Sequence, residues 1–232
     1  YTMQILDLLQ IKWFGNRMAY EKSPIRIITV GLNPSDKEFR NSNTDDFTTT
    51  LRFPDYNGTE ESLEIALNRY FEINPYNSWF KSFEHILNGM DASYYTDSEK
   101  THTAIHTDIC SPWATIPTWS KISKSERDYL RKTGFEDWKK LVEELKPHMM
   151  LFSIRNAYIN ELNIENMKEM TKFDVTGKGK QRKKPVIIHT GIYRDSMAIF
   201  GKTWNLPFGA LGTEQKNELG RMIKANMQNN RQ

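Results

Sequence analysis

The chain has 232 residues, with 32 Lys and Arg, 29 Asp and Glu, and a net charge of +3 at pH 7. Its 38% hydrophobic and 26% charged residues exclude a collagen-like, low-complexity or wholly disordered chain. No apolar run approaches the roughly 18 residues of a membrane span. A single cysteine excludes a disulfide framework and a four-cysteine metal site. The charge balance permits a polyanionic partner without requiring one.

The beginning of the chain and its cysteine content lead to two expectations about location. No charged-then-apolar leader opens the sequence, so we expect no secretory signal. One thiol fits a reducing compartment, and we therefore expect a cytoplasmic protein.

Four short apolar segments have the length of buried strands and are bounded by turn residues. They span residues 25–30, 104–110, 148–154 and 186–189. Apolar residues at helical spacing predict helices over residues 62–73, 77–90, 135–146, 156–170 and 213–227.

Strands that alternate with helices predict an α/β fold with three α/β/α layers and a central, four-stranded, mostly parallel sheet. We expect one domain over residues 1–232, with an N-terminal extension over 1–24 and a frayed tail over 228–232. Ligands of such sheets bind beyond the carboxyl ends of the strands, so the residues after each apolar segment are the first place to look for chemistry.

A basic segment over residues 174–184 precedes the fourth predicted strand and has five cations in its last seven residues. One interpretation is a solvated, mobile loop. The other is a loop that contacts phosphates, with binding that weakens as salt rises. The cations are Lys178, Lys180, Arg182, Lys183 and Lys184.

The first predicted strand ends in Gly31-Leu32-Asn33-Pro34-Ser35. Gly31 allows a backbone or a base to approach closely, and the Asn-Pro pair favours a tight turn that presents the Asn33 amide at the strand tip. An ordinary turn is the alternative, because Asn-Pro turns are common.

Polar residues follow the second and fourth predicted strands as well. Alternation places His106, Asp108 and Cys110 on one face of the second strand. A carboxylate there is costly unless it is paired or meets a ligand, so Asp108 is either a partner of an arginine or helix end, or a site residue. His106 alone is typical of a core histidine. His189 begins a polar cluster at the tip of the fourth strand.

Together these motifs resemble the uracil-DNA glycosylase superfamily over residues 25–201. Gly31-Leu32-Asn33-Pro34-Ser35 resembles the Gly-x-Asn-Pro motif of its mismatch-specific branch, and His189 matches the fourth-strand histidine. The stretch from Asn74 to Phe80 resembles the segment that leads into the next helix of that superfamily. The chain departs from the family at residues 189–193, where His-Thr-Gly-Ile-Tyr replaces His-Pro-Ser-Pro, and at Asp108, where members often have Asn.

The resemblance implies a monomeric DNA glycosylase that uses no metal and no cofactor and has DNA as its partner. Asn33 would orient the attacking water, and His189 would donate a hydrogen bond to O2 of the departing base. Phe53 or Phe39 would cover the base. The DNA contacts would come from Ser35, from Ile192 or Tyr193 as the inserted wedge, from Arg194, and from the basic segment.

Asp108 suggests which base is excised. An ionised carboxylate only accepts hydrogen bonds, so it matches the N4 amino group of cytosine and opposes O4 of uracil. A modified cytosine, such as the glucosylated hydroxymethylcytosine of phage DNA, is the favoured target and would imply a role in phage defence. Uracil remains an alternative target, since a protonated Asp108 would donate a hydrogen bond to its O4.

Three other functions stay open from the sequence. The divergent fourth-strand motif would suit a catalytically inactive nucleic-acid-binding module. A magnesium nuclease would use Asp55 and the Glu144-Leu145-Lys146 stretch, although the latter lies in a predicted helix. A hydrolase of free nucleosides or nucleotides would need a similar base site.

Overall fold

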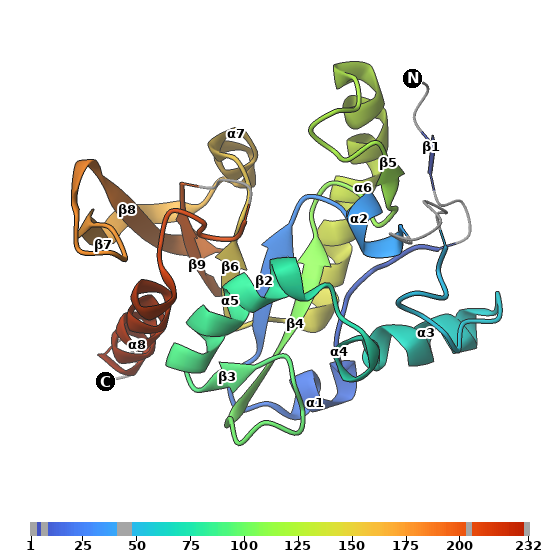
Figure 1. Cartoon of the computed structure of the whole chain (residues 1–232), viewed down its shortest axis with the longest axis horizontal. Coiled ribbons are helices and arrows are strands. Elements are labelled where there is room, and N and C mark those ends of the chain that lie inside the picture. The colour runs from blue at the N-terminus through green and yellow to red at the C-terminus, as the bar shows by residue number, and fades with distance from the viewer. Residues whose placement is uncertain (1–3, 6–8, 41–47, 203–205, 230–232) are drawn as a thin grey trace. The chain divides into compact units, whose positions relative to one another are not determined.

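The computed structural model describes residues 4–5, 9–40, 48–202 and 206–229 (Figure 1). The chain divides into two compact units, which exchange segments along the sequence. Unit 1 comprises Tyr1–Met18, Val30–Tyr76 and Ile105–Lys146. Unit 2 comprises Ala19–Thr29, Asn77–Ala104 and Pro147–Gln232.

The strands are β1 (Gln4–Ile5), β2 (Ile27–Gly31), β3 (Ala92–Ser93), β4 (His102–Asp108), β5 (Thr115–Ile116), β6 (Met149–Phe152), β7 (Glu165–Val175), β8 (Gln181–Tyr193) and β9 (Ser196–Gly201). The helices are α1 (Arg17–Lys22), α2 (Asp36–Phe39), α3 (Glu60–Asn68), α4 (Tyr70–Ile73), α5 (Asn77–Gly89), α6 (Lys124–Leu145), α7 (Asn156–Ile159) and α8 (Thr213–Asn229), and a 3₁₀ turn covers Asn160–Leu162. None of the helices in the described ranges is long and apolar enough to cross a membrane.

Seven strands form one mixed sheet in the order β3-β4-β2-β6-β9-β8-β7. β3 pairs in parallel with β4 and β6 with β9, whereas β8 is antiparallel to both of its neighbours. The prediction of an α/β fold is therefore confirmed, because helices flank a sheet that contains all four predicted strands. The prediction of four mostly parallel strands is wrong, because β3, β7 and β9 are additional and one end of the sheet is antiparallel.

The predicted helix over residues 156–170 is the main error. Only Asn156–Ile159 is α-helical, and Glu165–Val175 forms the edge strand β7 of unit 2. Most of the β7 side chains are exposed, and the strand is rich in Glu, Lys and Met, which are good helix formers. Backbone pairing with β8 overrides that local preference, and the charges and bulges along β7 suit an edge that must not pair with another chain.

The basic segment over residues 174–184 is a β-hairpin, so the expectation of a loop is wrong. β7 and β8 pair on both sides of a turn over residues 176–180, and the main-chain nitrogen of Thr176 donates to the oxygen of Lys180. Figure 1 shows this hairpin as the orange ribbon at the end of the sheet.

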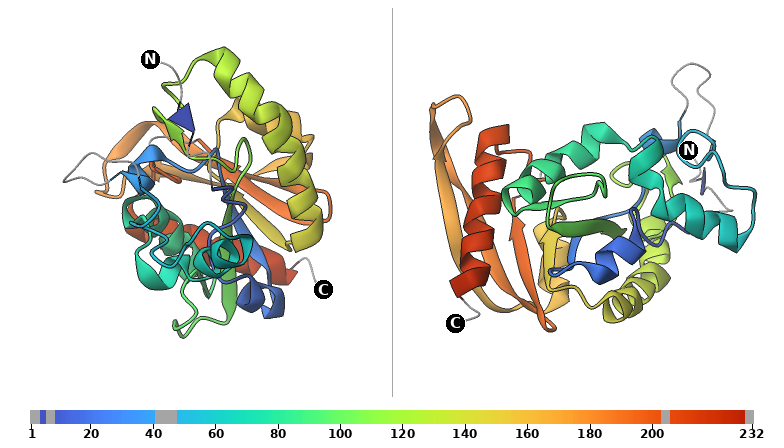
Figure 2. Two further views of the ribbon diagram at one scale, coloured as in Figure 1. Left: turned by 90° about the vertical axis from the view of Figure 1, so that its right-hand side faces the viewer. Right: turned by 90° about the horizontal axis from the view of Figure 1, so that it is seen from below.

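Two glycines let α5 and α8 cross closely within unit 2. The helices run side by side in Figures 1 and 2. A Cβ atom at Gly89 would meet the main-chain oxygen of Asn217, and one at Gly220 would meet the oxygen of Ile86. Both helices agree with the sequence predictions. The predicted tail over residues 228–232 begins inside α8, and residues 230–232 lie outside the described part of the chain.

In unit 1 the N-terminal segment adds to the end of β4. Phe14 forms an antiparallel bridge with His106, and the nitrogen of Ile11 donates to the oxygen of Pro112. Leu9, Ile11 and Phe14 are buried, so this part of the predicted extension belongs to the core.

The helix predicted over residues 135–146 is longer than expected and begins at Lys124. Ser123 and Glu126 form a capping box that fixes its start, which is a sequence signature of a helix N-terminus. Trp138 holds the helix on β4 by donating from Nε1 to Oγ1 of Thr107 at 3.0 Å.

Candidate active site at the ends of β2 and β4

The ends of β2 and β4 lie side by side in unit 1. The main-chain nitrogen of Ile109 donates to the oxygen of Gly31, and that of Cys110 donates to the oxygen of Leu32. Two of the polar strand ends that the sequence singled out, around Asn33 and around Asp108, are therefore adjacent.

Gly31 makes room for the protein's own side chains. A Cβ atom at this position would lie 2.5 Å from Oδ1 of Asp108 and 3.1 Å from Nε2 of His106. The expectation that Gly31 lets a base approach therefore needs correction, since two side chains of β4 fill that space.

Asp108 and His106 face each other, as alternation along the strand predicted. Nε2 of His106 lies 3.5 Å from Oδ1 of Asp108, and the two side chains are 2% and 3% exposed. The His106 ring also lies 5.9 Å from the ring of Phe14. Cys110, two residues after Asp108, is also buried. Burial is the main cause that raises the pKa of its thiol to about 12. The thiol is therefore no nucleophile at neutral pH.

The side-chain amide of Asn33 is held in place at the tip of β2. Nδ2 donates to the oxygen of Trp113 at 3.3 Å and to Oγ1 of Thr115 at 3.1 Å. These bonds use both amide hydrogens, and among the described residues Oδ1 has no hydrogen-bond partner. Since Asn33 is only half-buried, this oxygen is an oriented acceptor that water or a ligand can reach.

Glu38 is a site residue that the sequence analysis missed. It lies in α2, five residues after Asn33, and is 4% exposed. Its Oε2 accepts a hydrogen bond from the Tyr70 hydroxyl at 3.0 Å, and its Oε1 lies 3.5 Å from the nitrogen of Ser35. Burial, followed by the negative charge of Asp108, raises the pKa of Glu38 to about 8. The sequence offered only a weak signal, an acidic residue within one turn of a glycine-asparagine-proline strand end.

Arg52 joins α2 to the loop that contains Asn74 and Pro75. Nε donates to the main-chain oxygen of Glu38 at 2.7 Å, and Nη1 donates to the oxygens of Asn74 and Pro75. The guanidinium also lies 5.7 Å from the centre of the Tyr76 ring. The Asn-Pro-Tyr stretch that contributed to the family resemblance thus packs against the segment that carries Glu38.

Phe39 and Phe53 are core residues in this structure. Both have 0% exposure, and their rings stack 5.7 Å apart. Phe53 also lies 5.8 Å from Tyr70. Their predicted role as covers for a base stays a prediction that requires this cluster to open.

Ser35, which we expected to contact DNA, is half-buried and takes part in the local turn. Its Oγ accepts a hydrogen bond from the nitrogen of Lys37 at 3.2 Å, and its main chain bridges to Thr115.

His189 belongs to unit 2 and lies inside β8, not at a strand tip as predicted. It pairs with Glu169 on one side and Phe200 on the other, and its ring stacks on Phe200 at 5.5 Å. In the sheet order, β6 and β9 separate β8 from β2. The meeting of Asn33, Asp108 and His189 around one base stays a prediction.

The residues proposed to insert into DNA form the end of the β8–β9 hairpin. Ile192 is 37% exposed, whereas Tyr193 is only 6% exposed, so Ile192 is the better wedge. Arg194 occupies the left-handed region at φ 53° in the tight turn, with its guanidinium 5.6 Å from the centre of the Tyr193 ring.

The basic β7–β8 hairpin borders an open cavity of about 530 Å³ in unit 2. Lys178 and Lys180 are exposed on it. Arg182 instead clamps the hairpin to a neighbouring loop, because Nε donates to the oxygen of Val175 and Nη2 to the oxygen of Ala210. Lys183 and Lys184, further along β8, are also exposed.

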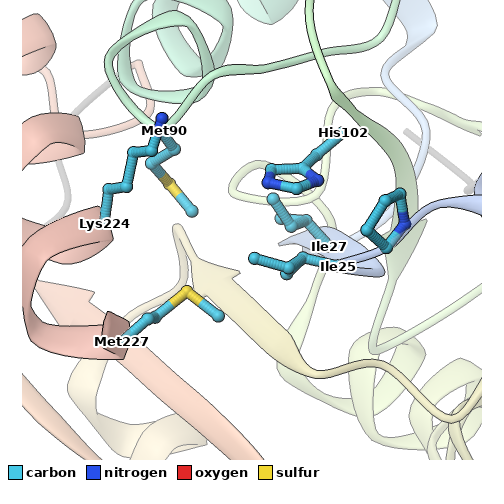
Figure 3. A pocket seen from close by; sticks show the side chains of 7 residues that line it. Ile25, Ile27, Met90, His102, Lys224 and Met227 are labelled. Atoms are coloured by element: carbon cyan, nitrogen blue, oxygen red, sulfur yellow. The ribbon is translucent and has the colours of Figure 1, made fainter. Parts of the chain in front are cut away.

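A second cavity of about 240 Å³ lies at the amino ends of β2 and β4, within unit 2 (Figure 3). Most of its lining is apolar, with one histidine and one lysine that binds Asp91. Its lining contains no carboxylate, so it lacks the acidic side chain that is found at the end of β4. It is lined by Pro24, Ile25, Ile27, Met90, His102, Lys224 and Met227.

No group of three or more His, Cys, Asp or Glu side chains in the described part of the chain is arranged to hold a metal ion. No protein-family model, curated protein or solved structure matches the chain. The glycosylase resemblance therefore stays a prediction from short motifs.

Proposed function

We propose that this chain is a DNA glycosylase that hydrolyses the N-glycosidic bond of a pyrimidine turned out of the DNA. The observation that carries the proposal is the fixed amide of Asn33, whose Oδ1 is an oriented acceptor at a strand end next to Asp108. Glycosylases must hold an extruded base beside a positioned water, and the oriented acceptor of Asn33 suits the second requirement.

In the proposed reaction, the oxygen of water bonds to C1′ of the sugar while the bond between C1′ and the base breaks. The attacking water releases one proton to solvent, and the base leaves with the bonding electrons and takes a proton from solvent. Asn33 orients the water through Oδ1 and does not act as a base, because an amide does not titrate. Rate enhancement then comes mainly from positioning and electrostatics.

Asp108 is proposed to read the base. A carboxylate accepts hydrogen bonds from an exocyclic amino group, so a cytosine-type base is favoured over uracil. A modified cytosine, such as a glucosylated hydroxymethylcytosine, is the proposed target. His189 is proposed to donate to O2 of the leaving base, and the DNA backbone is proposed to run along the exposed lysines of the β7–β8 hairpin.

The test is direct detection of freed bases. Purified protein is incubated with single- and double-stranded oligonucleotides that contain one uracil, hydroxymethylcytosine or glucosylated hydroxymethylcytosine, and products are identified by mass spectrometry. We expect a free base and an abasic site, and a roughly 10²-fold or greater loss of rate in Asn33→Ala.

Asn226→Ala is the matched control, since in the described part of the chain that exposed amide bonds only the oxygen of Met222 within α8. Salt-dependent DNA binding without any freed base would instead identify a catalytically inactive binding module. Release of bases from free nucleosides but not from DNA would also reject the proposal.

A further inference from the structure

The cavity of about 240 Å³ in unit 2 is recessed below the surface (Figure 3). Ile27, Met90 and Met227 in its walls are buried, with exposed fractions of 0%, 2% and 9%. Protein interiors are close-packed, and voids much larger than a water molecule are few in a domain. A cavity of this size therefore has room for a bound molecule.

The two helices on one side of the cavity cannot approach further to close it. A Cβ atom at Gly89 in α5 or at Gly220 in α8 would collide with a main-chain oxygen of the facing helix. Met90 follows Gly89 directly, and Met227 lies about two helical turns after Gly220. Because the helices are already in main-chain contact next to these methionines, this wall keeps its place without an occupant.

Hydrogen bonds fix the wall on the side of β2 and β4. Oγ of Ser23 accepts from the nitrogen of Thr103 at 3.0 Å and donates to the oxygen of Ile25 at 2.7 Å. The nitrogen of His102, at the start of β4, donates to the oxygen of Asp91. Ile25 and His102 are thus held by their main chains, and the cavity is preformed.

The lining offers few partners for water. Of the side chains that line the cavity, His102 and Lys224 carry polar atoms. Nζ of Lys224 lies 3.4 Å from Oδ2 of Asp91, and Figure 3 shows it beside Met90 and away from the middle of the cavity, which leaves the methylene stem as lining. Each buried water needs about two to four polar partners, so an apolar occupant is favoured over several waters.

Three side chains around the cavity favour an aromatic occupant. Figure 3 shows the thioethers of Met90 and Met227 and the ring of His102 directed toward the space between them. Thioether sulfur makes favourable contacts with aromatic rings, and flexible methionines adapt to the shape of a ring. An imidazole forms one hydrogen bond with a polar group of the occupant. Since an apolar cavity of about 150 Å³ binds benzene, this one has room for about nine or ten non-hydrogen atoms.

We propose that this cavity is a binding site for a small aromatic molecule of the size of indole, with an apolar ring system and one hydrogen-bonding group. The ring lies between the two methionines, and the polar group meets the imidazole of His102. A nucleobase does not suit this cavity, because its several polar atoms would lack partners. The site is therefore separate from the proposed base site, and this inference does not rest on the proposed function.

The test is an NMR titration of the wild-type protein, labelled with ¹³C at its methionine methyl groups, with indole as the probe. Met90→Leu and Met227→Leu identify the two signals of the cavity. We expect both signals to shift along one saturable curve with a Kd between about 10 μM and 1 mM. The signals of Met18 and Met167, which are 66% and 55% exposed, stay in place.

Two comparisons test the occupant and its place. Phenol and cyclohexanol have the same size and one hydroxyl group each, and we expect phenol to bind about threefold more tightly or better because only phenol makes sulfur–aromatic contacts. Ile25→Phe puts a ring into the cavity from a half-buried position and should weaken indole binding about tenfold or more. Ile65→Phe, at an exposed isoleucine of α3, is the matched control and keeps the wild-type Kd.

The wild-type titration is decisive by itself should Ile25→Phe fail to fold. Shifts that do not saturate, or shifts of equal size at Met18 and Met167, would overturn the site. Unchanged indole binding in folded Ile25→Phe would overturn it as well. Binding of cyclohexanol as tight as that of phenol would overturn the aromatic class of the ligand.

Discussion

Oδ1 of Asp108 lies only 2.5 Å from the ideal position of a Cβ atom at Gly31, too close for a side chain at that residue. The sequence suggested that Gly31 leaves room for a base. In the structure, a buried carboxylate of the neighbouring strand occupies that room instead. Asp108 is therefore held between β2 and His106, and its position depends on a residue with no side chain.

Gly31→Ala tests this packing. We expect a loss of about 1–3 kcal/mol in the free energy of unfolding, because the added methyl group must displace Asp108 and His106. The measurement is urea unfolding of the single variant and of Gly31→Ala/Asp108→Ala. The loss caused by Gly31→Ala shrinks in the Asp108→Ala background if the clash is the cause, and equal losses in both backgrounds would contradict it.

Glu38→Gln is expected to change the pH dependence of stability, independently of any activity. The folded-state pKa of about 8 lies above the ordinary value of 4.5, so the folded state keeps a proton that the unfolded chain has lost between these values. Wild-type stability therefore falls as pH rises from about 4.5 to about 8.

The glutamine variant lacks this loss and is more stable at pH 7 by about 3 kcal/mol, at 1.36 kcal/mol per pKa unit. Urea unfolding at pH 5, 6, 7 and 8 measures the difference. Glu218→Gln, an exposed change in α8, is the control. Parallel pH profiles for the wild type and Glu38→Gln would show that Glu38 is not protonated in the folded protein.

Thr115→Val tests the fixed amide of Asn33. The variant keeps the shape of a buried side chain but removes the Oγ1 that accepts from Nδ2 at 3.1 Å. If Asn33 positions water, the rate of base release falls about tenfold or more, because a loosened amide loses part of its positioning effect, while DNA affinity is unchanged. Single-turnover rates and binding titrations separate the two quantities, and an unchanged rate would count against the role of Asn33.

Asp108→Asn is expected to change the choice of base. An amide both donates and accepts, so it no longer opposes O4 of uracil as a carboxylate does. The ratio of uracil release to hydroxymethylcytosine release rises, by an amount that corresponds to about 1–3 kcal/mol of discrimination. Competition between the two oligonucleotides in one reaction measures the ratio directly. An unchanged ratio would show that Asp108 does not read the base.

The basic hairpin contains exposed cations and one arginine whose guanidinium bonds within the protein. Replacing exposed Lys178 or Lys180 with Ala should weaken DNA binding for all sequences and lower the salt slope by about one each. Arg182→Ala should instead destabilise the hairpin, because its guanidinium joins Val175 to Ala210. Fluorescence anisotropy at several salt concentrations and thermal unfolding distinguish these effects, and equal behaviour of all three variants would be contrary to the structure.

The amino-acid pattern alone was enough to predict the α/β class and the strands whose side chains are buried. All five residues of β2 and all four of β6 are buried, and such continuous apolar runs between turn residues are typical of covered strands. It also identified the adjacent strand ends around Asn33 and Asp108 and the shared face of His106 and Asp108. These features can be predicted because they depend on residue type and on periodicity along the chain.

The antiparallel end of the sheet and the surroundings of Glu38 depend on contacts between residues far apart in the chain. Glu165–Val175 has the composition of a helix and becomes a strand because β8 supplies its hydrogen-bond partners. Glu38 has nothing in its neighbouring sequence that marks it as buried. Its raised pKa comes first from its burial and then from the negative charge of Asp108, which is 70 positions away in the chain, and no local pattern encodes either cause.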